Sequence, residues 1–519
     1  MRRPNNKLLY VLTVLFGLML SCTNSDVTEE IPTLPTVDSV DTVIPKLTSV
    51  VFKCNDNPYQ LNDDIVCDII DDSIVICRIP NLVENKQLVP EFKYDGDKLL
   101  INDVQYEGGK YNFQRPVKIT LAVGMITKDY KMFVHSFTGL PVVWIDTDGK
   151  EDITSKEEYL NASFKLEEGQ ITRGVGDVIY DSLKIKGRGH SSWELDKKPY
   201  RLKFDKKISL FGDPKDKSWV LLANYNDKTM LRNQISLYLG KNSRLEWTPR
   251  AHFVELMLNG RYNGTYLLCE KIKVTENRVN IGDDGLLMEI DSYAKEDIYS
   301  RYFTTSHFKH EVNIKAPDVE YGDDTYNYAK SLMAEIEDVL FSDHFTDENE
   351  GWRKYLDEDS FIDWYLINEI TRNADAWGWS SVFFNLKRGE KLKIGPIWDF
   401  DLSFGNYSFS SRAYPPEGFY IMHYMPWYSR LFEDPSFVNS IKDRFQFFYE
   451  QKEAIFREMN DNTQYLKYAV VENENRWHTL YTYSWKNSNV WGNYDNEVQC
   501  MKQWLNKRLE WLRNEFDNM

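Results

Sequence analysis

The chain has 519 residues and a formal net charge of −17 at pH 7. This length exceeds what one hydrophobic core supports, so we expect roughly two or three domains. The acidic balance argues against a nucleic-acid-binding protein, because the phosphate backbone must be neutralised by Lys and Arg. Hydrophobic residues account for 42% of the sequence, which is enough to build packed globular domains.

The N-terminus has the pattern of an export signal over residues 1–22. Basic residues precede an apolar run from Leu8 to Leu20, which is too short to predict a membrane span and is typical of a signal peptide. Cys22 follows a small residue, Ser21, and this arrangement resembles the bacterial lipoprotein cleavage box.

That resemblance implies that Cys22 becomes the lipidated first residue of the mature protein. The lipid would anchor the chain at a bacterial membrane, at the outer membrane or the cell surface. Ordinary signal cleavage with release is the alternative. Residues 23–45 are rich in Pro, Thr and Asp without a repeating period, which predicts a flexible tether.

Residues 46–138 predict a small all-β domain. Short strand-like runs are separated by turn-forming pairs, and Val117 and Ile119 alternate with polar residues as in a half-buried strand. The regular spacing favours an immunoglobulin-like β-sandwich that acts as a spacer or docking domain. Cys67 and Cys77 could pair across two of its strands, although nothing in the sequence requires a disulfide.

A basic stretch with glycines follows in a strand-rich part of the chain. It reads GRGHSSWELDKKPYRLKF and spans residues 187–204. On the predicted strand at its end, Arg201 and Lys203 point to one side and the apolar residues between them to the other. Glycines let backbone N–H groups approach a phosphate and cations neutralise it, so this stretch is a candidate phosphate cradle. A solvated hairpin is the plainer interpretation.

Helices predominate after about residue 320, so the chain as a whole predicts an α+β fold. Ser360, followed by Asp363, resembles a capping box that opens a helix at Phe361. Asp434 before Pro435 predicts another helix start.

Three carboxylates lie close together in the sequence within residues 373–405. Asp375 follows the predicted helix from Phe361 to about Thr371, and Asp399 and Asp401 lie in an aromatic, apolar frame. Two short apolar runs between them predict a hairpin that folds Asp375 back towards Asp399. Carboxylate oxygens beside open space are what Mg²⁺ prefers. The alternative is that Asp399 and Asp401 cap local turns.

Four stretches, taken in order, resemble the CotH family, the spore coat protein H kinases with an atypical protein-kinase-like fold. They are GRGHSSWELDKKPYRLKF (187–204), WVLLANYNDKTMLRN (219–233), GTYLLCEKIKV (264–274) and NADAWGWSSVFFN…GPIWDFDLSFG (373–405). The resemblance implies a bilobal domain over residues 139–519. Its strand-rich lobe would end at about residue 310 and its helical lobe would begin at about 311.

The resemblance also implies roles for the matching positions. Asp375 matches the catalytic-loop Asp that orients or deprotonates the attacking hydroxyl, although it stands in NAD and not in HRD. Asp399 matches the DFG-like metal ligand, and Asp401 and Asn385 are further metal or phosphate contacts. The nucleotide would be held by Gly187, Arg188, Gly189, Ser191, Ser192, Lys198, Arg201, Lys203, Arg232 and Glu270.

Within that set the roles differ. Lys198, Arg201 or Lys203 would contact the nucleotide phosphates, and Lys203 is the preferred choice. Arg232 stands where a kinase usually places the Glu of its αC helix. Glu270 lies near the expected hinge, where adenine would bind.

The implied activity is that of a kinase using ATP and Mg²⁺ (or Mn²⁺) to phosphorylate Ser or Thr of an unidentified protein. Export would place the domain where ATP is scarce, so an inactive kinase-like surface lipoprotein that binds a glycan or a protein is the alternative. A Mg²⁺-dependent phosphoesterase is a third. The joint presence of Asp375, Asn385 and Asp399 favours chemistry over binding alone.

Overall fold

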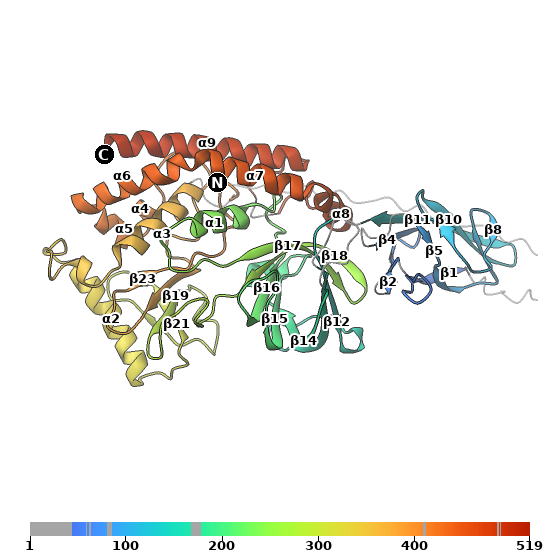
Figure 1. Cartoon of the computed structure of the whole chain (residues 1–519), viewed down its shortest axis with the longest axis horizontal. Helices are drawn as coiled ribbons and strands as arrows, with labels where there is room; N and C mark the ends of the chain where they lie inside the picture. Colours follow the sequence, from blue (N-terminus) through green and yellow to red (C-terminus); the bar gives the residue numbers. More distant parts are fainter. Residues whose placement is uncertain are drawn as a thin grey trace, which may run out of the picture. The chain divides into compact units, whose positions relative to one another are not determined.

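The computed structural model describes residues 44–519, except 59, 62–63, 80–85, 137, 168–177, 408–411, 485–486 and 488. The predicted signal peptide with Cys22, and the tether up to residue 43, lie outside the described residues. Residues 45–519 form one compact unit, so the predicted boundary at residue 138 stays a prediction. Among the described residues, no helix is both long and apolar enough to cross a membrane. The fold is mixed α+β, strand-rich first and helical later (Figure 1).

Two main sheets make up the first strand-rich part. One has the order β2-β1-β6, the other the order β3-β4-β11-β10-β7-β8, and β5 pairs with β9. Most neighbours are antiparallel, but β4 and β11 are parallel. The strands are β1 (Lys46–Phe52), β2 (Ile65–Val66), β3 (Asp68–Ile70), β4 (Ile74–Ile79), β5 (Gln87–Leu88), β6 (Glu91–Asp95), β7 (Lys98–Ile101), β8 (Val104–Gln105), β9 (Tyr111–Asn112), β10 (Val117–Val123) and β11 (Ile126–Ser136).

A closed seven-stranded barrel follows, with the order β12-β13-β14-β15-β16-β18-β17. Its strands are β12 (Val142–Thr147), β13 (Leu160–Glu167), β14 (Val178–Gly187), β15 (Tyr200–Ile208), β16 (Asp216–Leu222), β17 (Ala251–Leu258) and β18 (Arg261–Glu270). Tyr200, Leu202 and Phe204 of β15 are buried in one hydrophobic cluster. Because successive side chains on a strand alternate between its faces, Arg201 and Lys203 share the opposite face.

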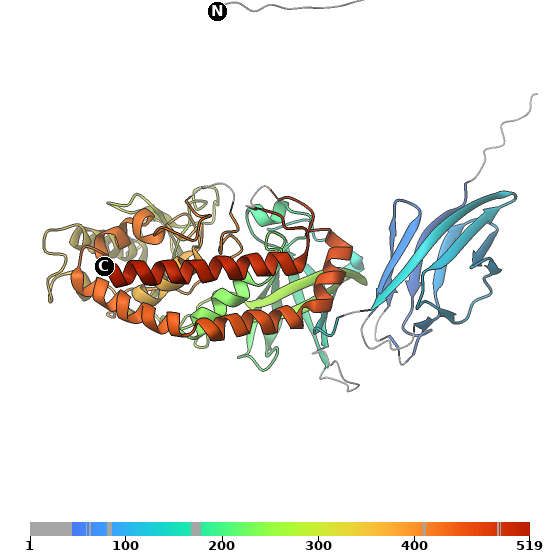
Figure 2. The same ribbon diagram turned by 90° about the horizontal axis from the view of Figure 1, so that it is seen from above.

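The remainder combines a five-stranded sheet, called the second sheet below, with helices. The sheet has the order β20-β21-β19-β22-β23, and α9 packs against α3 and α6 (Figure 2). The strands are β19 (Leu286–Ile290), β20 (Tyr302–Thr304), β21 (Glu311–Ala316), β22 (Val382–Leu386) and β23 (Lys393–Ile394). The helices are α1 (Arg232–Lys241), α2 (Asp324–Leu340), α3 (Glu358–Thr371), α4 (Ile421–Tyr424), α5 (Pro426–Leu431), α6 (Pro435–Glu450), α7 (Lys452–Tyr465), α8 (Lys467–Trp477) and α9 (Tyr494–Asn518), with short 3-10 turns at Asp148–Lys150, Ser191–Glu194 and Trp352–Lys354.

The helix caps confirm one prediction and correct another. Asp434 caps α6 with Pro435 in its first turn, as predicted. The capping box at Ser360 was wrong, because α3 begins three residues earlier. Asp357 is its N-cap and accepts the backbone N–H of Ser360 at 2.9 Å. Asp363 is buried and binds Arg244 instead.

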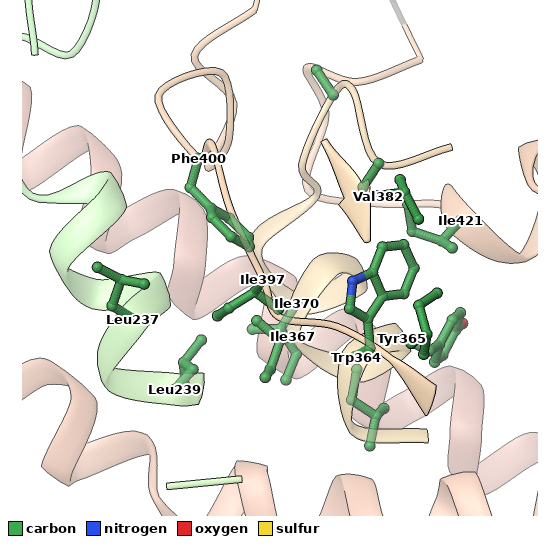
Figure 3. Packing of buried hydrophobic residues seen from close by; sticks show 14 of the residues in the cluster. Leu237, Leu239, Trp364, Tyr365, Ile367, Ile370, Val382, Ile397, Phe400 and Ile421 are labelled. Atoms are coloured by element: carbon green, nitrogen blue, oxygen red, sulfur yellow. The ribbon is translucent and has the colours of Figure 1, made fainter. Parts of the chain in front are cut away.

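The hairpin predicted between the carboxylates is present as β22 and β23. The largest hydrophobic cluster supports the chain that follows it. Ile397 and Phe400 are buried in the same cluster as Leu237 of α1 and Ile370 of α3 (Figure 3). This packing fixes the backbone on both sides of Asp399, which therefore lies on a rigid base.

Candidate functional site

A cavity of about 900 Å³ collects side chains from segments far apart in the sequence. Its lining comes from the glycine-containing turn after β14, from β15 and β16, from the segment after β18, from the second sheet and from the loops that carry Asp375 and Asp399. The residues expected from the sequence that line it are Arg188, Gly189, Ser191, Ser192, Arg201, Asp375, Asp399 and Asp401.

Three hydrogen bonds join the two carboxylate loops, and two of them are between backbone groups. Asn373 Nδ2 donates to the carbonyl of Asp399 at 3.3 Å, and the N–H of Ala374 donates to the carbonyl of Leu402 at 3.2 Å. The N–H of Phe404 donates to the carbonyl of Thr371 at 2.7 Å. The loops therefore behave as one unit, and Asp375 cannot move independently of the aspartates that follow the hairpin.

Asp399 adopts a left-handed backbone conformation with φ 64°. Asp accepts this conformation more readily than most residues, but it still costs free energy, and such residues concentrate at functional sites. The next residue is anchored, because the N–H of Phe400 donates to Asn233 Oδ1 at 2.9 Å. The buried Phe400 and the exposed Asp399 thus point to different environments.

The glycines of the turn are required by close packing. A Cβ on Gly187 would lie 2.3 Å from the Trp193 ring, so only glycine lets that ring fold against the end of β14. Gly189 has φ +85°, and a Cβ there would lie 2.1 Å from Ser192 Oγ. The turn is therefore compact, and its residues Gly189, Ser191 and Ser192 line the cavity.

Five Lys and Arg side chains share the cavity lining, namely Arg188, Arg201, Lys271, Lys273 and Lys315. Burial, reinforced by the charges of Arg201, Lys315 and Arg188, lowers the pKa of Lys271 to about 7. Burial likewise lowers the pKa of Arg188, against the opposing effect of Asp399. Cations that depress one another's charge mark a place where an anion is stabilised.

Paired and aromatic groups complete the lining. Lys315 forms an ion pair with Glu289 at 3.2 Å. The guanidinium of Arg188 lies 5.8 Å from the centre of the Trp398 ring. At the glycine turn, His190 stacks on Tyr293 with ring centres 3.8 Å apart, and Tyr293 meets Trp379 edge-on at 6.0 Å.

The residues present fit an anionic ligand and, with its help, a divalent metal. Arg201 Nε is buried without a hydrogen-bond partner among the described residues, although it belongs to a cavity-lining side chain. Over the same residues, no group of three or more His, Cys, Asp or Glu is arranged to hold a metal by itself. Mg²⁺ commonly takes only one or two carboxylates plus substrate phosphates, so Asp399 and Asp401 suit a site that phosphate oxygens complete.

The structure places several predicted nucleotide contacts outside this lining. Lys203, the preferred phosphate ligand, is exposed two residues beyond Arg201, roughly 7 Å farther along β15. Lys198 Nζ donates to the carbonyl of Trp193 at 2.7 Å, inside the turn. Gly187 is the packing glycine described above. We therefore drop these three as ligand contacts.

Two further expected contacts belong to the framework. Arg232 is buried, forms an ion pair with Asp227 and donates to the carbonyl of Ser403 at 3.0 Å. Glu270 is buried and pairs with Arg278 at 3.4 Å. Arg232 and Glu270 are each neutralised by an ion pair within the protein. They therefore support the site from behind and do not line the cavity.

Asn385 also lies elsewhere. Its Nδ2 donates to the carbonyl of Gly395 at 3.0 Å, and it lines a separate cavity of about 150 Å³. The predicted role of Asn385 as a metal or phosphate contact is therefore not supported by its position.

Sequence reasoning missed Lys271, Glu289, Lys315 and Tyr293, which all line the cavity together with Trp398 of the predicted aromatic frame. Lys271 directly follows the end of β18, next to the singled-out Glu270, so its position offered a weak signal. The others come from the second sheet and the loops around it, and no motif marks them.

Comparison with known proteins decides the family. A family model described as CotH kinase protein matches residues 185–512, which is well over half of the chain. The chain belongs to the CotH kinase family. The match includes the glycine turn, Lys271 and all three carboxylates, and it leaves out β1 to β13.

No match was found among curated proteins. Among solved structures, the chain is similar to a provisionally assigned glycoside hydrolase from Bacteroides thetaiotaomicron, with 13% identity and a TM-score of 0.16. That alignment covers 52% of this chain and 65% of the other one. The likeness is too low to carry an argument about fold or activity.

Proposed function

We propose that this CotH family protein is a phosphotransferase that transfers the γ-phosphoryl group of ATP, with Mg²⁺ or Mn²⁺, to Ser or Thr of a protein acceptor. The observation that carries the proposal is the meeting of Asp375, Asp399 and Asp401 with five Lys and Arg side chains in one cavity. Phosphoryl transfer depends mainly on positioning and charge neutralisation, and this lining offers both.

The cations divide between holding phosphate and setting the local field. Arg188 comes from the glycine turn and Arg201 from β15, and both have side chains in the cavity lining. The unpartnered Nε of Arg201 is a donor ready for a phosphate oxygen. Lys271 would regain its full charge beside a polyphosphate, because the anion offsets the repulsion from its neighbours.

The carboxylates serve the metal and the acceptor. Asp399 and Asp401 would hold the metal, which, when bound, neutralises charge on the transferred phosphate. Asp375 would orient the acceptor hydroxyl and take its proton as the new O–P bond forms and the bond to ADP breaks. Its loop is tied to the Asp399 loop, so the proton acceptor and the metal ligands keep their spacing.

The apolar part of the lining suits a nucleobase. Val220 of β16, Leu287 of β19 and Phe383 of β22 line the same cavity as the phosphate-type cations. Apolar and cationic side chains in one cavity match the two ends of a nucleotide, its base and its phosphates.

The test is a thermal-shift and calorimetric titration of the full-length chain in detergent with Mg²⁺-ATP. Wild type should gain thermal stability by mass action, and Asp399→Ala should lose that gain. Asp343→Ala is the matched control, because Asp343 is an exposed carboxylate outside the cavity. No shift in wild type with ATP or GTP, with either Mg²⁺ or Mn²⁺, would overturn the proposal. Binding without phosphate transfer to any protein would favour the inactive, ligand-binding alternative.

We also propose that the chain is exported and lipid-anchored through Cys22, on the pattern of its N-terminus. Cys22→Ser should move the protein from the membrane fraction to the soluble one. Retention of that variant in the membrane fraction would contradict lipid anchoring at this residue.

A further inference from the structure

Cys67 and Cys77 face each other in the first strand-rich part. Strands β3 and β4 are antiparallel, and their register pairs Asp68 with Ile76 and Ile70 with Ile74. One step farther from the turn, the same register sets Cys67 opposite Cys77. Neither residue lines the cavity described above.

The hydrogen bonding makes Cys67 and Cys77 a non-hydrogen-bonded antiparallel pair, the type in which facing residues lie closer together. The N–H of Cys67 donates to the carbonyl of Val50 on β1 at 2.9 Å, and not to β4. Facing residues without mutual hydrogen bonds have Cα atoms about 4.5 Å apart, with their side chains closest together. A disulfide needs Cα atoms about 4.4–6.8 Å apart, so the backbone need not move to form one.

Both thiols lie in the buried core. Cys67 is 3% exposed and Cys77 is fully buried, and both belong to one hydrophobic cluster. Burial, together with a hydrogen bond to Cys77, raises the pKa of the Cys67 thiol well above its ordinary value. A thiol with a raised pKa is a poor nucleophile, so any bond between the two must form before the core closes.

We propose that Cys67 and Cys77 form a disulfide when the chain folds in the presence of a disulfide oxidant. The thiolate of one cysteine attacks the oxidant's S–S bond, which breaks as a mixed disulfide forms. The thiolate of the other cysteine then attacks the first cysteine's sulfur and releases the oxidant as two thiols. The cysteines lose two electrons and two protons, and the oxidant gains both.

The position of Cys67 gives the bond a structural purpose. Cys67 lies between β2, which belongs to the three-stranded sheet, and β3, which belongs to the six-stranded sheet. A bond to Cys77 on β4 therefore fixes the point where the chain passes from one sheet to the other. It also pins the register of β3 against β4, which would otherwise rest on a short three-pair ladder.

The experiment refolds the denatured, reduced full-length chain in oxidised and reduced glutathione, then alkylates it with N-ethylmaleimide in denaturant. Trypsin cuts after Lys53 and Arg78 and nowhere between, so Cys54, Cys67 and Cys77 lie on one peptide. We expect one adduct on this peptide, on Cys54, and three adducts after reduction. Three adducts without reduction would overturn the proposal.

Two variants exclude other pairings. Cys54→Ser should leave the peptide with no adduct before reduction. Cys67→Ser should give two adducts, on Cys54 and Cys77. No adduct in Cys67→Ser would show that Cys77 pairs with Cys54 and would refute the proposed bond.

Discussion

The helical region and the cavity both contain buried charges, but they use them differently. In the helical region Glu369 and Arg508 are fully buried and form an ion pair. Glu369 also accepts the backbone N–H groups of Tyr420 at 2.7 Å and Ile421 at 2.8 Å. Asp363 is likewise held, by Arg244 and Arg444. Each of these carboxylates is therefore neutralised by ion pairs and hydrogen bonds within the protein itself.

In the cavity the balance is incomplete. Five Lys and Arg side chains line it together, the pKa of Lys271 is lowered to about 7, and Arg201 Nε has no partner among the described residues. Burying charge without a partner costs free energy, so such an arrangement is stable only where water or a ligand reaches it. The comparison teaches that paired charges hold this fold, and that half-paired ones mark where a ligand is bound.

The largest expected effect is on phosphate transfer. Asp375→Asn keeps the size and the polar contacts of the side chain but removes its ability to take a proton. Transfer should fall by about 10²- to 10⁴-fold, the usual contribution of a general base. Binding of Mg²⁺-ATP should stay near the wild-type value, as measured by calorimetry. An equal loss in binding would show that Asp375 acts on the nucleotide and not on the acceptor.

The next largest expected effect is on stability and comes from the buried ion pair between Glu369 and Arg508. Glu369→Gln leaves Arg508 buried without a counter-charge, and breaking such a pair costs about 3–5 kcal/mol of unfolding free energy. Denaturant unfolding measures this change. Arg513→Met is the control on α9, the helix that carries Arg508. Arg513 is exposed, its ion pair with Asp517 is long at 3.8 Å, and its hydrogen bond to the Tyr449 hydroxyl at 3.1 Å lies at the surface. That control should change stability by no more than about 0.5 kcal/mol.

A matched pair on β15 tests the cavity directly. Arg201→Met should weaken nucleotide binding by about 10- to 100-fold, because charge-assisted hydrogen bonds contribute about 1.5–3 kcal/mol. Lys203→Met changes a residue on the same strand and the same face, but outside the lining, and should leave affinity unchanged. A loss on Lys203→Met with none on Arg201→Met would restore the assignment made from the sequence.

The smallest effect is a pH dependence of binding. A polyphosphate raises the pKa of Lys271 above its free value of about 7, so binding takes up a proton. The contribution of Lys271 to nucleotide affinity is fully present below about pH 7. It is lost as the pH rises through the pKa that Lys271 has in the nucleotide complex. Calorimetric affinities between about pH 6 and 9 should show this slope in wild type, and Lys271→Met should flatten it. An identical slope in both proteins would assign the titration to another group.

Sequence patterns located much of this site in advance. The segment around Asp375, Asp399 and Asp401 was predictable, because a helix, a hairpin and an apolar frame bring these carboxylates together over a short stretch of chain. The glycine turn with Arg188 was predictable for the same reason. Local spacing carries such information, since neighbouring residues in one motif share a fixed geometry.

The tertiary structure decided which charges face the cavity. Arg201 and Lys203 carry the same charge and share a face, and only the position of β15 in the barrel separates a lining residue from an exposed one. Arg232 and Glu270 resemble ligands in the sequence but are paired inside the fold, whereas Lys271 gained its place through the way β18 ends between β16 and β17. The sequence by itself determined the local motifs and the carboxylates, because both depend on short-range geometry. The partners of each charge depend on contacts between distant segments, which only packing can set.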